Sequence, residues 1–392
     1  MISGDPFMKK SLLALVALGA FAGAAHAQSS VTLYGIIDEG FIFNNNAKGK
    51  HLYGLSSGVL QGSRWGLRGT EDLGGGLKAV FVLENGFDVN TGGLKQGGLE
   101  FGRQAYVGLG SGFGTVTLGR QYDSVVDFVG PLEAGDQWGG YIAAHPGDLD
   151  NFNNAYRVNN AIKYTSPTYN GFSFGGLYSF GGQAGQFAKN QVWSLGAGYN
   201  NGPLVLGVGY LNARTPANFG GMFNNGSTAS TTIASTPIYG PYAATANTYQ
   251  VIGAGGAYTF GAATIGATYS NTKFKGFTAG GFSGTATFNN GEINFKYQLT
   301  PALILGAAYD YTQGSKIGDA SAAKYHQGSL GVDYFLSKRT DVYVIGVYQH
   351  ASGKTLDPKN NEPVDATAAI NGLDPSTSKN QVAARVGIRH KF

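Results

Sequence analysis

The chain has 392 residues and a formal net charge of +4, and 13% of its residues are charged, against roughly 25% in soluble domains. So small a net charge gives no reason to expect nucleic-acid binding. The absence of cysteine excludes disulfides and thiolate metal sites, while 64 glycines, 23 tyrosines and 24 phenylalanines favour strands joined by tight turns.

The first 27 residues comprise seven upstream residues and, from Met8, the pattern of a cleavable export signal. Two lysines follow Met8, an apolar run covers residues 12–25, and small residues close the segment at 25–27. A retained anchor helix is disfavoured, because about 20 apolar residues are needed to span a bilayer. The mature chain is therefore predicted to be a single domain over residues 28–392.

About sixteen later segments alternate apolar residues with small or polar ones, and turn signals separate them. This alternation is typical of a transmembrane β-barrel, whose wall meets lipid on one side and water on the other. An even number of strands returns both chain ends to the periplasm. The predicted strands start near residues 31, 60, 77, 99, 115, 156, 172, 191, 203, 248, 262, 286, 302, 324, 340 and 380.

The predicted connections are of two kinds, as the topology of a barrel requires. Seven are short and rich in Gly, Asn, Pro and Asp, which favours turns at the periplasmic end. Long polar loops alternate with them, and these are predicted to face outside. The short turns are 70–76, 110–114, 166–171, 200–203, 260–261, 298–301 and 336–339, and the principal long loops are 123–155, 214–247 and 351–379.

Segments 192–199 and 204–210 place large apolar residues on one face and Gly or Ser on the other, a pattern that a soluble β-sandwich core would share. The closing segment favours the barrel. Ala383, Val386 and Ile388 are predicted to line nearly one face with the terminal Phe392, and the charges of this segment suit neither a buried core strand nor an exposed soluble edge.

Basic residues recur within the predicted strands. Arg64 and Arg68 lie on one face of the second strand, with Trp65 and Leu67 on the other. An arginine that faces lipid near the bilayer midplane costs about 2–4 kcal/mol, so these side chains are predicted to face a watery lumen. The same argument applies to Arg103, Arg157 and Lys163, and to Arg120 nearer a strand end.

The long loop 123–155 follows the first arginines and is acidic. Folded into the lumen opposite the arginines, it would narrow the pore and filter solutes by charge and size. The alternative is an exposed acidic loop, with arginines that only satisfy hydrogen bonds in the lumen. The acidic residues of the loop are Asp127, Glu133, Asp136, Asp148 and Asp150.

Segments 30–38, 63–78 and 102–109, with the terminal Phe392, resemble the general-diffusion porins of Gram-negative outer membranes, especially the β-proteobacterial type. The resemblance covers essentially residues 28–392. It implies a homotrimer of sixteen-stranded antiparallel barrels in the outer membrane, in contact with lipids and lipopolysaccharide, each with its own channel and an inward third extracellular loop. Phe392 resembles the signal by which the barrel-assembly machinery recognises such proteins.

The resemblance also implies a constriction. Arg64, Arg103 and Arg157 resemble the family's basic ladder, and segment 131–136 resembles the turn of the inward loop, where either Glu133 or Asp136 would be the acidic partner. Ile36 stands where some members carry a basic residue. The predicted constriction sets Arg64, Arg103 and Arg157 against Asp127, Glu133 and Asp136, with Arg68, Arg120 and Lys163 extending the basic wall.

The predicted function is passive diffusion of small hydrophilic solutes and ions, with no cofactor, metal or catalytic step. A sugar- or anion-specific channel is the nearest alternative, and an outer-membrane enzyme or an adhesive barrel are more distant ones. Asp148 and Asp150 offer oxygen ligands for Ca²⁺ but lack the full ligand spacing. The five histidines after the signal lie far apart, without metal-ligand spacing: 51, 145, 326, 350 and 390.

Overall fold

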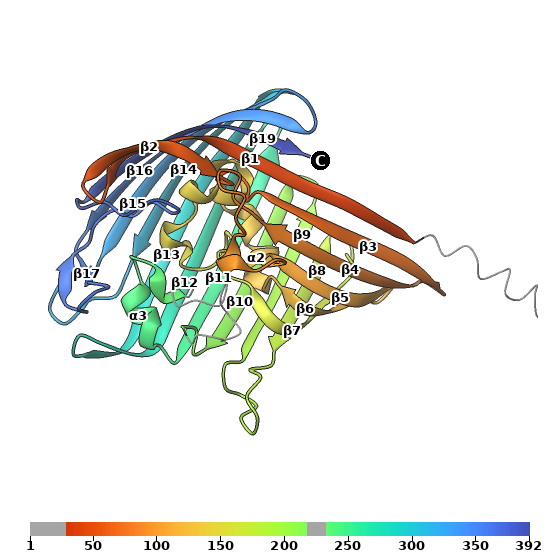
Figure 1. Cartoon of the computed structure of the whole chain (residues 1–392), viewed down its shortest axis with the longest axis horizontal. Helices are drawn as coiled ribbons and strands as arrows, with labels where there is room; N and C mark the ends of the chain where they lie inside the picture. The colour runs from red at the N-terminus through yellow and green to blue at the C-terminus, as the bar shows by residue number, and fades with distance from the viewer. Residues whose placement is uncertain (1–28, 218–232) are drawn as a thin grey trace, which may run out of the picture.

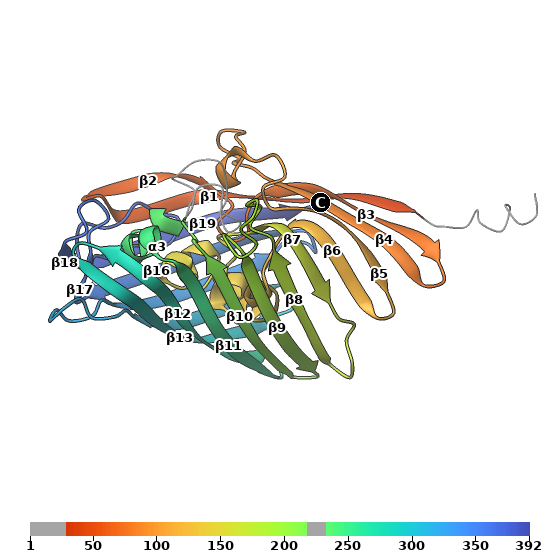
Figure 2. The ribbon, with the colours of Figure 1, turned by 90° about the horizontal axis from the view of Figure 1, so that it is seen from below.

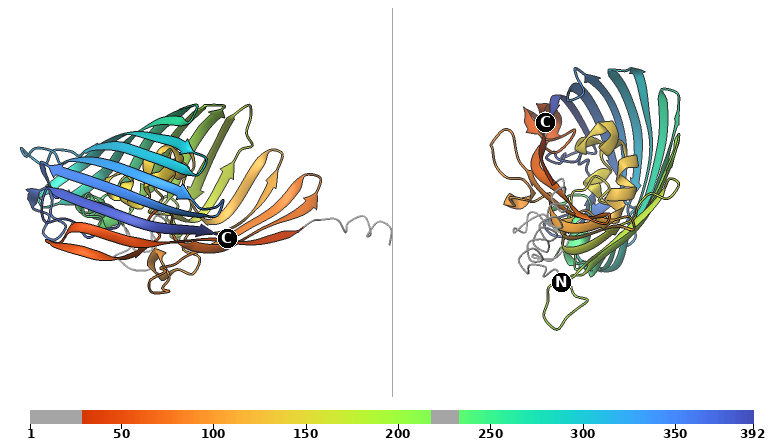
Figure 3. Two further views of the ribbon diagram at one scale, coloured as in Figure 1. Left: turned by 90° about the horizontal axis from the view of Figure 1, so that it is seen from above. Right: turned by 90° about the vertical axis from the view of Figure 1, so that its right-hand side faces the viewer.

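The structure is a computed structural model that describes residues 29–217 and 233–392, so the predicted export signal lies outside the described residues. Seventeen strands form one closed antiparallel sheet (Figures 1 and 3). β2 (Lys50–Ser57) and β3 (Arg64–Gly74) both pair with β1 (Ser30–Ala47), so they are two halves of one wall strand. Pairing of β1 with β19 (Asn380–Lys391) closes the ring. The predicted sixteen-stranded barrel is confirmed.

The remaining wall strands follow in chain order, each paired with the next. They are β4 (Leu77–Gly86), β5 (Gln104–Ser111), β6 (Gly114–Gln121), β7 (Val158–Thr165), β8 (Phe172–Ser179), β9 (Val192–Asn201), β10 (Leu204–Arg214), β11 (Thr248–Phe260), β12 (Ala263–Ala279), β13 (Phe282–Thr300), β14 (Leu303–Gln313), β15 (Lys324–Phe335) and β16 (Thr340–Ser352). Outside the wall, β17 (Lys354–Leu356) pairs with β18 (Pro363–Asp365).

Helical elements occupy only the connections. Among the described residues, no helix is long and apolar enough to cross a membrane. They are η1 (Gln96–Gly98), α2 (Ser124–Phe128), η2 (Gly130–Leu132), η3 (Gly135–Gly139), η4 (Tyr141–Ala143), η5 (Pro146–Asp148), η7 (Ile233–Ser235) and α3 (Gly240–Thr245).

Most predicted strand starts lie within two residues of the observed ones, but β5 begins five residues after the predicted start at 99 and β13 begins four residues before the predicted start at 286. The largest difference is at the second strand. That strand begins at Lys50 and is interrupted over residues 58–63. Gly58 has a φ of +72°, a conformation that glycine adopts without strain. The interrupted stretch meets a distant loop, since the amide of Tyr141 donates to the Val59 carbonyl at 2.7 Å. The interruption is therefore a contact site rather than a simple defect in the wall.

The seven predicted short turns all join adjacent strands, and the predicted long loops join strands at the other end of the barrel (Figure 2). Along β13 the exposed fraction alternates as expected: Glu292 and Asn294 are buried on the inner face, while Ile293 is 57% exposed on the outer one. In β19 the prediction for Ala383 is wrong. Ala383 lies on the buried face, and Val386 and Ile388 lie on the exposed one, because their positions differ by an odd number.

Residues 122–157, here called the inward loop, lie inside the barrel between β6 and β7 (Figure 3). Glycines on the inner wall make room for this loop. A Cβ on Gly207 would lie 1.9 Å from the Phe128 carbonyl oxygen, and one on Gly306 would lie 2.2 Å from the Trp138 ring. The inward loop therefore packs against Gly-rich faces of the wall strands, because residues without a side chain allow the loop to approach closely.

Candidate functional site

A cavity of about 480 Å³ separates the inward loop from the wall made by the early strands. Four basic side chains line it, and Asp136 is their acidic counterpart. Three of the four are the predicted arginines, and the fourth is a lysine that the sequence reasoning missed. The four basic residues are Arg64, Lys95, Arg103 and Arg157.

The arginines come together because each stands where an early strand begins. Arg64 is the first residue of β3, and Arg103 and Arg157 directly precede β5 and β7. The prediction that these side chains lie within strands near the bilayer midplane is wrong. They stand where the chain enters the wall from a loop, so their side chains meet the inward loop rather than the opposite wall.

Glu84, near the C-terminal end of β4, forms ion pairs with two of these arginines. Its carboxylate lies 2.8 Å from Arg103 Nε and 3.7 Å from Arg64 Nε. Tyr34 also donates to it at 3.0 Å. A carboxylate that faces lipid is also disfavoured, although less than an arginine, so the place of Glu84 within a predicted strand was a usable signal.

Arg157 and Lys95 complete the basic side of the cavity. The Arg157 guanidinium lies over the Tyr122 ring at 5.3 Å and donates to Asn154 Oδ1 at 3.0 Å. Lys95 Nζ donates to the Ser57 carbonyl at 2.7 Å, next to the interruption of the second strand. Lys95 lies in a loop, where a charge has no strand pattern to mark it.

The two candidate acidic residues of the inward loop have different surroundings. Asp136 lines the cavity, and its Oδ1 accepts from Asn153 Nδ2 at 2.9 Å. Glu133 is fully buried and accepts from the His145 amide at 2.6 Å, away from the arginines. Of the two alternatives that the sequence left open, the geometry therefore places Asp136 opposite the basic residues.

The other predicted members do not line this cavity. Asp127 forms an ion pair with Lys163 at 2.5 Å, so each charge is largely balanced by the other. Arg120 donates to the Gly102 carbonyl at 2.9 Å and to Asn159. Arg68 is exposed, with its guanidinium 5.2 Å from the Tyr34 ring.

Asp123 fixes the start of α2 and hence the path of the inward loop. Its carboxylate accepts from the amides of Val125 and Val126 and from Asn151 Nδ2 at 2.7 Å, which is an N-cap. Burial raises the pKa of Asp123 to about 6, although the three donors favour the ionised form.

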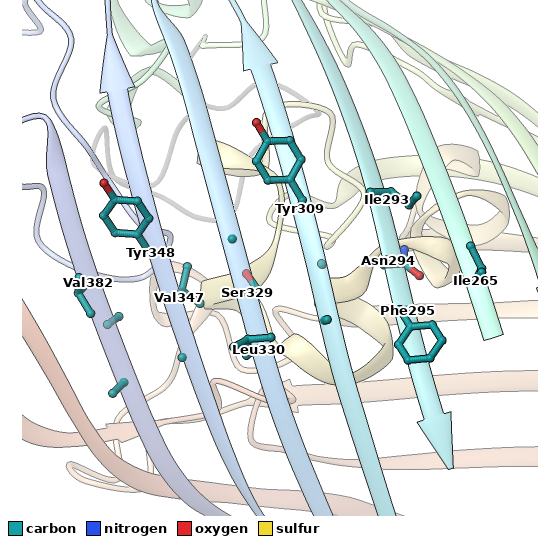
Figure 4. A pocket seen from close by; sticks show the side chains of 16 residues that line it. Ile265, Ile293, Asn294, Phe295, Tyr309, Ser329, Leu330, Val347, Tyr348 and Val382 are labelled. Carbon is teal, nitrogen blue, oxygen red and sulfur yellow. The ribbon is translucent and has the colours of Figure 1, made fainter. Parts of the chain in front are cut away.

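A second, apolar groove lies on the outer wall across β12 to β19 (Figure 4). Ile293, Phe295 and Leu330 contribute large side chains, and glycines and alanines form its floor. Such a surface suits contact with lipid or protein and offers nothing to a hydrophilic solute. The polar cavity of the lumen is therefore the candidate solute site.

The chain is similar to known proteins in both sequence and structure. The family model described as Gram-negative porin matches residues 14–354. The chain is 33% identical to an outer membrane porin protein of Bordetella pertussis and 32% identical to outer membrane porin protein 32 of Delftia acidovorans, and each alignment covers 98% of this chain and 100% of the relative. A solved structure, the anion-selective porin from Comamonas acidovorans, matches with a TM-score of 0.72 and 26% identity over 93% of this chain and 100% of that one.

Proposed function

This chain belongs to the Gram-negative porin family, and we propose that its water-filled channel through the outer membrane favours anions. Passive diffusion of small hydrophilic solutes and ions is the activity of such a channel. The observation that carries the anion preference is the cavity at the inward loop, which four basic side chains and one acidic side chain line.

The physical reason is the excess of positive charge where the path is narrow. Arginine stays protonated at any ordinary pH, and Arg64, Arg103 and Arg157 converge on one volume. Glu84 balances only part of this charge. A pore whose lining carries one sign of charge concentrates ions of the other sign and repels ions of its own.

The relative from Comamonas acidovorans, whose printed title calls it anion-selective, supports this preference. A sugar- or anion-specific channel is the competing proposal, which the same basic cavity would suit if it held one solute tightly. Binding of that kind saturates, whereas diffusion through a wide filter does not. We further propose a homotrimer whose outer walls contact lipids and lipopolysaccharide.

Single-channel recording in planar lipid bilayers tests the function directly. We expect conductance to appear in steps of three, and a reversal potential in a KCl gradient whose sign shows Cl⁻ to be more permeant than K⁺. A reversal potential of the opposite sign would refute the anion preference. Saturable block by one sugar or anion would favour the specific channel instead.

We propose Phe392 as the assembly signal for the barrel-assembly machinery. Its backbone forms two hydrogen bonds of 3.1 Å with Gly35, and its ring packs over that glycine, leaving 41% of the residue exposed. Deleting Phe392 is expected to lower the amount of folded, heat-modifiable barrel in outer membranes severalfold. Deletion of the residue should spare refolding in detergent, because the last strand keeps its other pairings. If the deletion lowers the yield of folded barrel equally in outer membranes and in detergent refolding, Phe392 contributes to barrel stability and is not an assembly signal.

A further inference from the structure

Four carboxylates surround one histidine where the inward loop touches the far wall. Glu133, His145 and Asp150 belong to the inward loop, Glu292 to β13 and Asp310 to β14. The first three are 0% exposed, and the two wall residues are 4% and 2% exposed. The cluster lies on the opposite side of the inward loop from the arginine cavity and has no part in the proposed selectivity.

The charges of this cluster do not balance. Among the ion pairs of residues 29–217 and 233–392, these four carboxylates meet no base except His145. Buried carboxylates without a counter-charge are strongly disfavoured, so the cluster must hold either extra protons or a cation.

The imidazole of His145 is oriented by hydrogen bonds on one side. Its Nδ1 lies 2.7 Å from Asp150 Oδ2, and Ser270 donates to the same carboxylate oxygen at 2.5 Å. A carboxylate beside Nδ1 keeps the proton there, which leaves the lone pair of Nε2 available as a metal ligand. Asp150 is thus a positioning residue for Nε2.

Nε2 points to a set of oxygens at distances that fit a shared ion. Glu292 Oε2 and Asp310 Oδ2 lie 3.8 Å away, and Glu133 Oε1 lies 4.0 Å away. These separations are too long for hydrogen bonds, whereas two ligands each roughly 2.1 Å from one ion can lie up to about 4.2 Å apart. Thr268 Oγ1, at 3.2 Å, is the one hydrogen-bond partner of Nε2 among the described side chains.

Two carboxylate oxygens of the cluster are unsatisfied. Glu133 Oε2 and Glu292 Oε2 are buried and have no hydrogen-bond partner in the described part of the chain. Buried polar atoms are seldom left without a partner, and two such atoms on carboxylates that surround one imidazole indicate a ligand. Ligand atoms of Glu133, His145 and Glu292 all lie within 4.8 Å of one another.

We propose that Glu133, His145, Glu292 and Asp310 bind a divalent transition-metal ion, with Zn²⁺ the best match. One imidazole nitrogen and several carboxylate oxygens are a donor set that Zn²⁺ accepts, while Ca²⁺ and Mg²⁺ favour oxygen ligands alone. The ion joins the inward loop to β13 and β14, so it fixes how far the loop extends into the lumen. The sequence shows no metal-ligand spacing because the ligands, from the inward loop, β13 and β14, are brought together only when the barrel closes.

Metal analysis and thermal conversion test the proposal on protein extracted from outer membranes. The native protein is dialysed against a chelator, exposed to Zn²⁺ alone, and freed of excess ion. We expect about one Zn²⁺ per chain, and a higher temperature for conversion of the folded barrel to its unfolded electrophoretic form. Asp150→Asn should weaken Zn²⁺ binding by about 10–100-fold, as changes to a histidine's hydrogen-bond partner do elsewhere.

The variant Glu133→Gln distinguishes a metal-binding site from a cluster whose carboxylates only share protons. It removes one ligand charge but keeps an oxygen for the His145 amide, so the barrel should fold and lose the effect of Zn²⁺ on conversion. His51→Gln, at an exposed histidine, is the matched control and should behave as wild type. The proposal is overturned if the wild-type protein takes up no Zn²⁺, or if Glu133→Gln binds and responds to Zn²⁺ as the wild type does. Ion selectivity is a separate readout, so failure here leaves the proposed function standing.

Discussion

Replacing Arg64 and Arg103 with Ser is expected to lower the ratio of Cl⁻ to K⁺ permeability several-fold. A unit charge about 8 Å from a passing ion in water contributes roughly 0.5 kcal/mol, and each arginine acts on anions and cations with opposite sign. Both side chains line the cavity at the inward loop. The reversal potential in a KCl gradient measures the change, which should be largest at low salt because ionic screening is weakest there.

Glu84 and Arg339 provide the controls for this experiment. In the double variant the Glu84 carboxylate has lost both of its arginine partners. Adding Glu84→Gln removes this negative charge, which makes the filter more positive by one unit, so part of the Cl⁻ preference should return. Arg339→Ser removes the same charge from an exposed short turn and should leave selectivity unchanged. If the double variant and the turn variant give the same reversal potential as wild type, the two arginines do not belong to the filter.

The barrel itself could be predicted from local patterns. Alternation with a period of two, short turns and long loops recur in every part of the chain, so errors at single strands do not change the architecture. The interruption at 58–63 was missed because it depends on a contact with Tyr141, far along the chain. Ala383 was assigned to the wrong face because successive residues of a strand point to opposite faces, so an error of one position moves a side chain from the lipid face to the lumen face.

The arginines of the site were predictable because charge is costly in a membrane wall, whatever the details of the fold. Their partners were harder to identify. Glu84 lies in a strand, where its charge carries a smaller cost of the same kind, and was overlooked, while Lys95 lies in a loop without a pattern. Asp127 was assigned to the filter by its position in the chain, yet it pairs with Lys163 because α2 turns it toward β7. Such pairings depend on the path of the inward loop, which sequence periodicity does not describe.

Replacing Arg385 with Met is expected to destabilise the barrel by about 3–5 kcal/mol, the usual cost of leaving a buried charge without its partner. Arg385 is 0% exposed on β19. Its Nη2 lies 3.1 Å from Asp38 Oδ1, and its Nε donates to Tyr343 Oη at 2.7 Å. These contacts join β19 to β1 on one side and to β16 on the other, at the seam that closes the ring.

Urea unfolding in detergent micelles measures this loss, and a second substitution identifies its cause. Arg385→Met combined with Asp38→Asn removes both charges, so the double variant should be more stable than Arg385→Met alone, although Tyr343 and Gln61 still contact residue 38. His390→Gln changes an outward-facing position five residues further along the same strand and should have little effect. If the double variant loses as much stability as the two single variants together, packing at the seam rather than ion pairing holds the first and last strands in place.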